Sequence, residues 1–507
     1  MRLRRLLAAA AFTLTAFPTS RLSAQDRPGG SLAPVLQPFF AARSWRNATW
    51  GALVVSLTYG DTLFSWRADT RLTPASNAKL FTTAAALHYL GDGYRFLTVL
   101  FADGPIANGE LFGDLVLYGT GDPTFALDTA SLAPFADSVV RAGIRRVRGD
   151  LVGDASYLGA ELSGPGWSPD NLDQAYAAPP SALGAAENRI WLEVLPGPRV
   201  GSPATFRLDP AGDYYHISSL VLTSGPRTRR HIDVRRGQSR GVVELSGSIP
   251  VTSGGWGTWL IVQEPAVFAA QLLRQLLEVR GVTIVGGTRA VTGDAPGRAQ
   301  LMLQRSQGGR YDAFRGAIAV RRSATLDDLV SMINHRSHNL SAELALRSIG
   351  RVAGNAGTFA SGARVVQRYL TETVGIPPAA VQITDGSGLS LLDEATPRSL
   401  VQLLSYERRA GGSQAFYRSL PVVGEGIGTR MSETAAVGRL RAKTGTLSGV
   451  SALSGYVVTA GGEELVFSLI VNHSPSTSRA RAVQDSVGAW LADWVRDAPV
   501  RRAAAGN

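Results

Sequence analysis

The pattern of apolar positions predicts two strands and a buried helix near the start of the chain. Apolar segments at 51–58 and 62–66 are separated by Tyr59-Gly60-Asp61, which is typical of a turn between two strands. A helical segment follows over 76–90, and its apolar residues lie nearly all round the helix axis. We therefore expect this helix to be buried, with Ser76 at its N-terminus.

The chain changes character after this helix. Residues 95–255 consist of short strand-like segments rich in glycine and proline, with one helix expected over 131–142. Gly113-Asp114-Leu115-Val116 recurs as Gly149-Asp150-Leu151-Val152, which indicates a repeated type of strand. We predict a β-rich insert over 95–255, formed by one domain or two subdomains, with an internal boundary near 177–180.

Helical patterns return after the insert, and strands follow them. The further helices are expected at 31–44, 265–280, 326–336, 341–352, 362–374, 398–410 and 478–497, and the further strands at 438–446, 450–458 and 464–473. We expect the strands of both chain ends to form one antiparallel sheet with helices on both faces. The predicted fold class is α/β (α+β) and multidomain. A discontinuous domain over 25–94 and 256–500 is interrupted by the insert.

The first 24 residues are typical of a secretory signal. Arg2, Arg4 and Arg5 precede a short apolar run over 6–17, and cleavage is expected before Gln25. The run is shorter than the ~20 residues of a membrane span. Removal of residues 1–24 takes away four arginines and no acidic residue, so the formal net charge of +11 falls by four. The chain has no cysteine, which is common in an exported enzyme of a bacterial periplasm.

The densest basic segment runs from Arg227 to Arg240. It has no interleaved aromatic residues for base stacking, so the basic balance does not indicate nucleic-acid binding. We interpret this segment as a solvated hairpin turn. Contact with an anionic polymer of the cell envelope is the alternative.

Lysine occurs at only two positions, Lys79 and Lys443, among 51 basic residues. Lysine can lose its proton inside a folded protein, whereas arginine cannot. Lys79 follows Ser76 by three residues, so on a helix the two side chains lie on one face. This spacing predicts a serine nucleophile with a lysine as its base.

Two further motifs complete a set with Ser76-x-x-Lys79. Ser337-His338-Asn339 lies in a loop between two expected helices, and Lys443-Thr444-Gly445 lies on an expected strand. The trio S-x-x-K, S-x-N and K-T-G is typical of penicillin-binding proteins and class A β-lactamases. Gly237-Gln238-Ser239-Arg240-Gly241 fits G-x-S-x-G, but a strand is expected after it where a nucleophile elbow needs a helix. The histidines lack H-E-x-x-H spacing, so neither a metal nor another cofactor is implied.

With these motifs the chain resembles the D-alanyl-D-alanine carboxypeptidase/endopeptidases of peptidase family S13, which are class C penicillin-binding proteins of the penicillin-binding protein 4 type. About 260 residues separate the first two motifs, which fits the large inserted domains of that family and not the shorter gap of β-lactamases. Further stretches that look familial are Gly121-Asp122-Pro123-Thr124, Gly166-Trp167, Ala178-Pro179-Pro180, Asp385-Gly386-Ser387-Gly388-Leu389-Ser390 and Leu420-Pro421. His338 departs from the aspartate that the family often has there.

The resemblance implies hydrolysis of the amide between two D-alanines, and the residues of the motifs suit that reaction. Ser76 would attack and form an acyl-enzyme, with Lys79 as base. A free lysine has a pKa of ~10.4, so action near neutrality needs a shift of ~3 units. Burial and the second cation at Lys443 both lower the pKa of Lys79. Ser337 would relay a proton to the leaving amine, and Asn339 would hold Lys79 and the substrate backbone.

The third motif is expected to bind substrate. Lys443 and Thr444 would bind the terminal carboxylate, and Gly445 would let the strand approach the ligand closely. The resemblance implies an oxyanion hole formed by the backbone N–H groups of Ser76 and Thr446.

Two other segments have weaker signals. The resemblance points to Asp154 as a contact for the amino group of a diaminopimelate side chain, and an ordinary turn aspartate is the alternative. We expect Asp385 to Ser390 to form a structural loop beside the site.

Other functions stay open at this point. A serine β-lactamase or a related esterase would share the motifs, although the E-x-x-L-N stretch of class A enzymes is absent. A non-catalytic cell-wall binding protein is the alternative from another class. The expected partners are peptidoglycan peptides and β-lactam antibiotics, with no nucleic acid and no transmembrane anchor. The expected location is the periplasm, and a homodimer stays open.

Overall fold

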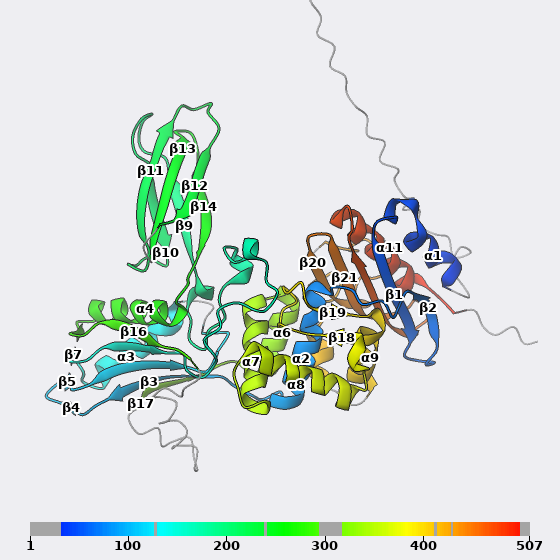
Figure 1. The fold of residues 1–507 in the computed structure, drawn as a ribbon, viewed down its shortest axis with the longest axis horizontal. Coiled ribbons are helices and arrows are strands. Elements are labelled where there is room, and N and C mark those ends of the chain that lie inside the picture. Colours follow the sequence, from blue (N-terminus) through cyan, green and yellow to red (C-terminus); the bar gives the residue numbers. More distant parts are fainter. Residues whose placement is uncertain are drawn as a thin grey trace, which may run out of the picture.

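The computed structural model describes residues 32–125, 129–237, 241–293, 317–409, 413–426 and 429–496. The signal expected over 1–24 lies outside them. Within the described part of the chain, no helix is long and apolar enough to cross a membrane. The molecule is elongated (Figure 1): a sheet domain built from both chain ends is followed by a block of helices, and the insert lies beyond that block.

The two chain ends form one antiparallel sheet with the order β2-β1-β22-β21-β20, as expected. Its strands are β1 (Thr49–Ser56), β2 (Thr62–Trp66), β20 (Leu440–Leu447), β21 (Val450–Val458) and β22 (Glu464–Asn472). Successive residues of a strand face opposite sides, so Ala52 and Val54 enter one core and Leu53 enters the other. Burial on both faces explains the continuous apolar runs of these strands.

Helices cover both faces of this sheet. One face is covered by α1 (Ala33–Ala41) and α11 (Thr477–Asp493). The other face packs against α2 (Ala78–Leu90) and α9 (Pro397–Arg409), behind which lie α6 (Leu326–Arg336), α7 (Asn339–Ala353), α8 (Phe359–Arg368) and α10 (Gln414–Arg418). Residues 78–87 of α2 are buried all round, which confirms the expectation from its sequence. A short pair, β18 (Val381–Gln382) and β19 (Glu394–Ala395), brackets the 385–390 loop.

The first part of the insert is a layer of helices on sheets. Its main sheet has the order β16-β8-β6-β3-β17, and a smaller one has the order β15-β7-β5-β4. The bounds are β3 (Leu97–Asp103), β4 (Ile106–Ala107), β5 (Glu110–Leu111), β6 (Asp114–Gly119), α3 (Ala133–Arg141), β7 (Arg146–Val147), β8 (Leu151–Asp154), α4 (Pro265–Val279), β15 (Thr283–Ile284), β16 (Thr288–Val291) and β17 (Ala317–Arg322). The repeated Gly-Asp-Leu-Val segments are neighbouring parallel strands, with Leu115 opposite Leu151.

Strand pairing places the end of the insert later than the expected boundary at residue 255. β16 pairs with β8 and β17 pairs with β3, while α4 packs its apolar side into the same core. The described residues from 265 to 322 therefore belong to the insert, and the boundary at 255 is wrong. The helical pattern of α4 resembled those of the sheet domain, and only its partners distinguish it.

The second part of the insert is a pair of small sheets that projects from α4 (Figure 1). One sheet has the order β10-β9-β14 and the other β11-β13-β12. The bounds are β9 (Arg189–Leu195), β10 (Thr205–Asp209), β11 (His216–Ser224), β12 (His231–Arg236), β13 (Val242–Pro250) and β14 (Trp256–Ile261). The G-x-S-x-G sequence has its centre at 238–240, outside the described residues, and a strand follows it, so it lacks the helix of a nucleophile elbow.

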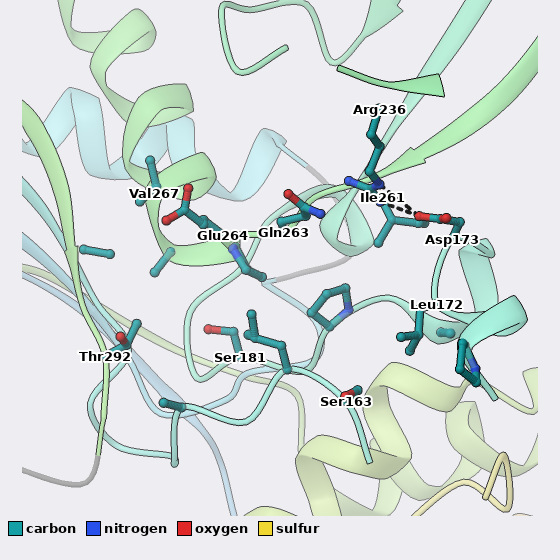
Figure 2. A pocket seen from close by; sticks show the side chains of 18 residues that line it. Ser163, Leu172, Asp173, Ser181, Arg236, Ile261, Gln263, Glu264, Val267 and Thr292 are labelled. Carbon is teal, nitrogen blue, oxygen red and sulfur yellow. Dashed lines mark hydrogen bonds and ion pairs between the residues drawn. The ribbon is translucent and has the colours of Figure 1, made fainter. Parts of the chain in front are cut away.

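The arginine-rich segment divides into two kinds of residue. Arg227, Arg229 and Arg230 are exposed in the connection from β11 to β12, as expected for a solvated segment. This connection is not the expected hairpin turn, because β13 lies between β11 and β12 in the sheet. Arg236 instead pairs with Asp173, with Nη2 at 2.6 Å from Oδ1. Figure 2 shows this pair at the wall of a cavity of about 750 Å³, where β12, the start of α4 and residues 160–181 meet. No residue of the three motifs lines this cavity.

Candidate active site

The first motif lies at the junction between a short 3₁₀ turn, η2 (Ala75–Asn77), and α2. Lys79 is fully buried, and its Nζ lies 3.0 Å from Ser76 Oγ. Nζ also donates to Asn339 Oδ1 at 2.7 Å and to the backbone carbonyl of Ser387 at 2.7 Å. The helical spacing of Ser76 and Lys79 thus brings the two groups into hydrogen-bond contact, as their sequence predicted.

The backbone around Ser76 is unusual in two respects. Ala75 has φ of +47°, a left-handed conformation that is uncommon for a residue with a side chain. Gly445 on β20 passes so close that an added Cβ would lie 2.8 Å from the carbonyl oxygen of Pro74 and 3.1 Å from the nitrogen of Ser76. The turn and the strand therefore need a glycine at their contact, and the backbones of Ser76 and the third motif are neighbours.

The second motif lies at the end of α6 and the start of α7. Ser337 ends α6 in the left-handed region, with φ of +53°, and His338 caps α7 by accepting from the N–H of Ser341. Asn339, the first residue of α7, accepts from Lys79 and donates from Nδ2 to the carbonyl of Tyr176 at 2.9 Å. The sharp reversal at Ser337 directs the serine and the asparagine toward the two lysines.

The third motif adds the second lysine. Lys443 is 1% exposed, and its Nζ donates to Ser337 Oγ at 2.9 Å and to the carbonyl of Thr444 at 2.8 Å. The backbone carbonyl of Lys443 accepts from Asn77 Nδ2 at 2.9 Å, which ties β20 to the turn that carries Ser76. The structure therefore brings together Ser76, Lys79, Ser337, Asn339 and Lys443 from segments far apart in the sequence.

The comparisons with known proteins agree with this geometry. The family model described as D-Ala-D-Ala carboxypeptidase 3 (S13) matches residues 39–494. The chain belongs to this S13 family.

Two relatives and one solved structure illustrate the match to the S13 family. The D-alanyl-D-alanine carboxypeptidase of Actinomadura sp. (strain R39) is 34% identical over 508 residues, which cover 96% of this chain and 90% of the relative. The D-alanyl-D-alanine carboxypeptidase DacB of Haemophilus influenzae is 26% identical over 434 residues, covering 83% and 85%. The crystal structure of penicillin binding protein 4 (dacB) from Haemophilus influenzae has a TM-score of 0.77 at 24% identity, covering 91% of this chain and 99% of that chain. This similarity shows the fold.

The electrostatics of this S13 site suit a lysine that loses its proton. Burial lowers the pKa of Lys79 to about 8, against the opposing effect of Glu343, Asp385 and Asp393. Burial, and then the neighbouring Lys79, lower the pKa of Lys443 well below its ordinary value. The sequence led us to expect a permanent charge on Lys443, and the substrate-free site instead disfavours that charge.

The 385–390 loop is closer to the chemistry than its sequence suggested, because the carbonyl of Ser387 accepts directly from Lys79. Asp385 holds the loop: its carboxylate accepts from the N–H groups of Ser387, Gly388 and Ser390 and from Trp167 Nε1 at 2.8 Å. Trp167 belongs to the segment of residues 155–188 that connects β8 to β9, so the insert also supports this loop.

Asp154 is the last residue of β8, in the insert. It is 1% exposed and accepts from the N–H of Ser156 at 2.9 Å. Its contact with a substrate amino group stays a prediction.

Thr446 is at the exposed end of β20, where its hydroxyl accepts from Arg481 Nη2 at 2.9 Å.

Proposed function

We propose that this chain is a serine D-Ala-D-Ala carboxypeptidase and D,D-endopeptidase that acts on peptidoglycan stem peptides and cross-links through an acyl-enzyme at Ser76. The observation that carries the proposal is the position of the buried Lys79 Nζ between Ser76 Oγ and Asn339 Oδ1. Membership of the S13 family supports the same activity. The solved structure of a penicillin binding protein 4 with a bound β-lactam supports acylation by penicillin.

The hydrogen bonds of Lys79 support its role as base. An ammonium donates three hydrogens and accepts none, and Nζ has Ser76 Oγ, Asn339 Oδ1 and the carbonyl of Ser387 within reach. The amide oxygen and the carbonyl oxygen can only accept. A neutral Lys79 therefore keeps its two hydrogens on these oxygens, and its lone pair faces Ser76. Loss of one proton reverses the contact, so that the Ser76 hydroxyl donates to Nζ.

Acylation then follows from these positions. Ser76 Oγ attacks the carbonyl carbon of the penultimate D-alanine while its proton moves to Lys79. The backbone N–H groups of Ser76 and Thr446 would stabilise the oxyanion. The C–N bond breaks, and the leaving amine takes a proton through Ser337, whose Oγ accepts from Lys443. Water hydrolyses the ester, which restores the Ser76 hydroxyl and releases the shortened peptide.

Lys443 and Thr444 would bind the terminal carboxylate of the substrate. In the free site, burial disfavours the ammonium form of Lys443. An arriving carboxylate supplies an opposite charge nearby and raises the pKa of Lys443 again. Substrate binding and protonation of Lys443 are therefore coupled in this proposal, and a neutral ligand would not gain from the same contact.

Several finer properties belong to the same proposal. A signal over residues 1–24 would direct the chain to the periplasm, where peptidoglycan peptides are its partners. Asp154 would contact the amino group of a diaminopimelate side chain. A homodimer stays a prediction without support from a contact described above.

The experiment that tests the function is mass spectrometry of purified muropeptides after digestion. We expect wild type to remove the terminal D-alanine from pentapeptides and to cleave cross-links, and Ser76→Ala to do neither. Unchanged muropeptides after incubation with wild type would refute the proposal. Rapid turnover of nitrocefin in place of slow stoichiometric acylation would indicate a β-lactamase.

A further inference from the structure

A buried carboxyl group lies beside the base and has no part in the mechanism above. Glu343 is on α7, four residues after Asn339, and its side chain is fully buried. Its Oε2 accepts from the N–H of Gly386 at 2.6 Å, and its Oε1 has no hydrogen-bond partner among the described residues. A buried carboxylate with one oxygen unsatisfied is costly unless it acts on a neighbouring charge or takes up a proton.

The contacts of Glu343 lead to Lys79 through one loop. Glu343 accepts from the N–H of Gly386. The next residue is Ser387, and its carbonyl accepts from Lys79. Thr82, one helical turn after Lys79, binds the carbonyl of the same Gly386 at 2.8 Å. Glu343 and Thr82 therefore support the same segment of the loop, but only Glu343 can carry a charge.

Asp385, Asp393 and Lys443 are the other titratable groups near Lys79. Asp385 already accepts from three backbone N–H groups of the loop and from Trp167. Burial, and then the adjacent Asp385, raise the pKa of Asp393 well above its ordinary value. Lys443, on β20, is not an alternative partner, because burial and then Lys79 lower its pKa well below the ordinary value. Glu343 differs from both acids in its position, because it holds the peptide unit next to the carbonyl that accepts from Lys79. Burial and Asp385 also raise the pKa of Glu343 to about 8, where Lys79 titrates.

We propose that Glu343 is a positioning residue whose buried carboxyl group sets the protonation state of Lys79. The inference rests on the proposed function of Ser76 and Lys79. An ionised Glu343 favours the ammonium form of Lys79, and a protonated Glu343 lets Lys79 become neutral. The buried pair thus carries no net charge whether its single proton is on the lysine or on the carboxyl group. A buried pair without net charge avoids the cost of an uncompensated buried charge.

The test is the pH dependence of acylation by a fluorescent penicillin, measured for wild type, Glu343→Gln and Thr82→Val. Glutamine can still accept from the N–H of Gly386, but it carries no negative charge. Removal of that charge lowers the pKa of Lys79, so Lys79 is neutral at lower pH. We expect the acid limb of the Glu343→Gln profile to lie about 1 pH unit or more below that of wild type.

Thr82→Val is the matched control, because it removes the other side-chain contact to Gly386 without changing a charge. We expect it to lower the rate while the limb stays at the wild-type pH. A Glu343→Gln limb at the wild-type pH would overturn the proposal, since Glu343 would then only support the loop.

A second measurement needs no substrate. Infrared difference spectra of the wild-type protein should show a protonated carboxyl band that titrates over the same pH interval as acylation. The band should be missing from Glu343→Gln, which distinguishes Glu343 from the buried carboxyl group of Asp393. Absence of such a titrating band would also overturn the proposal. A wild type that penicillin does not acylate would refute the proposed function, while the infrared titration would still decide whether Glu343 and Lys79 share a proton.

Discussion

Replacement of Lys79 by arginine tests whether Lys79 acts as a base or only supplies a positive charge. Burial lowers the pKa of Lys79 from 10.5 to about 8. This shift of about 2.5 units corresponds to about 3 kcal/mol in favour of the neutral form. At pH 7 roughly one-tenth of the molecules then have a neutral Lys79, compared with roughly 0.03% at the ordinary value. An arginine, with a pKa above about 12, has essentially no neutral form.

We therefore expect Lys79→Arg to reduce the second-order rate of penicillin acylation by at least about 1,000-fold, within the range that general base catalysis supplies. Gel fluorescence after timed exposure to a fluorescent penicillin measures this rate, and thermal unfolding followed by circular dichroism checks that the variant folds.

Lys443→Arg is the matched control, because Lys443 is expected to bind an anion and an arginine can do so. We expect this variant to keep part of the activity, although the larger side chain must fit a site in which Lys443 is 1% exposed. Equal tolerance of the two substitutions would show that Lys79 is not the base.

Two further substitutions test the surroundings of the site. Gly445→Ala places a Cβ 2.8 Å from the carbonyl oxygen of Pro74, so the strand must move away from Ser76. We expect the rate of penicillin acylation to fall at least about 10-fold, with a small change in melting temperature. A wild-type acylation rate would contradict this prediction. Trp167→Phe removes the Nε1 donor to Asp385 and leaves that buried carboxylate less satisfied. We expect urea unfolding to show a loss of about 1.5–3 kcal/mol, and an unchanged midpoint would mean that the contact contributes nothing.

The sequence was informative where function depends on side chains at fixed local spacing. Ser76 and Lys79 lie one helical turn apart, and Lys443 is on a regular strand, so the motifs could be placed before their contacts were known. The antiparallel sheet was also predictable, because its strands are apolar runs at the two chain ends.

The rest depends on main-chain groups and on partners distant in sequence. The carbonyls of Ser387 and Tyr176 complete the hydrogen bonds of Lys79 and Asn339, and no side-chain pattern marks a carbonyl. Glu343 did leave a signal, since it is a charged residue inside an apolar stretch of α7, but its role needs the position of Gly386. The end of the insert was predicted too early, because β16 and β17 belong to the insert through their pairing with β8 and β3. Such pairing between distant segments leaves no pattern in the sequence.

The measurement that tests the central claim most directly is the mapping of the penicillin adduct by peptide mass spectrometry. The account predicts one penicilloyl group on Ser76 in wild type, retained in Lys443→Arg at a lower level and absent from Ser76→Ala. An adduct on another residue, or labelling of Ser76→Ala at the wild-type level, would contradict it.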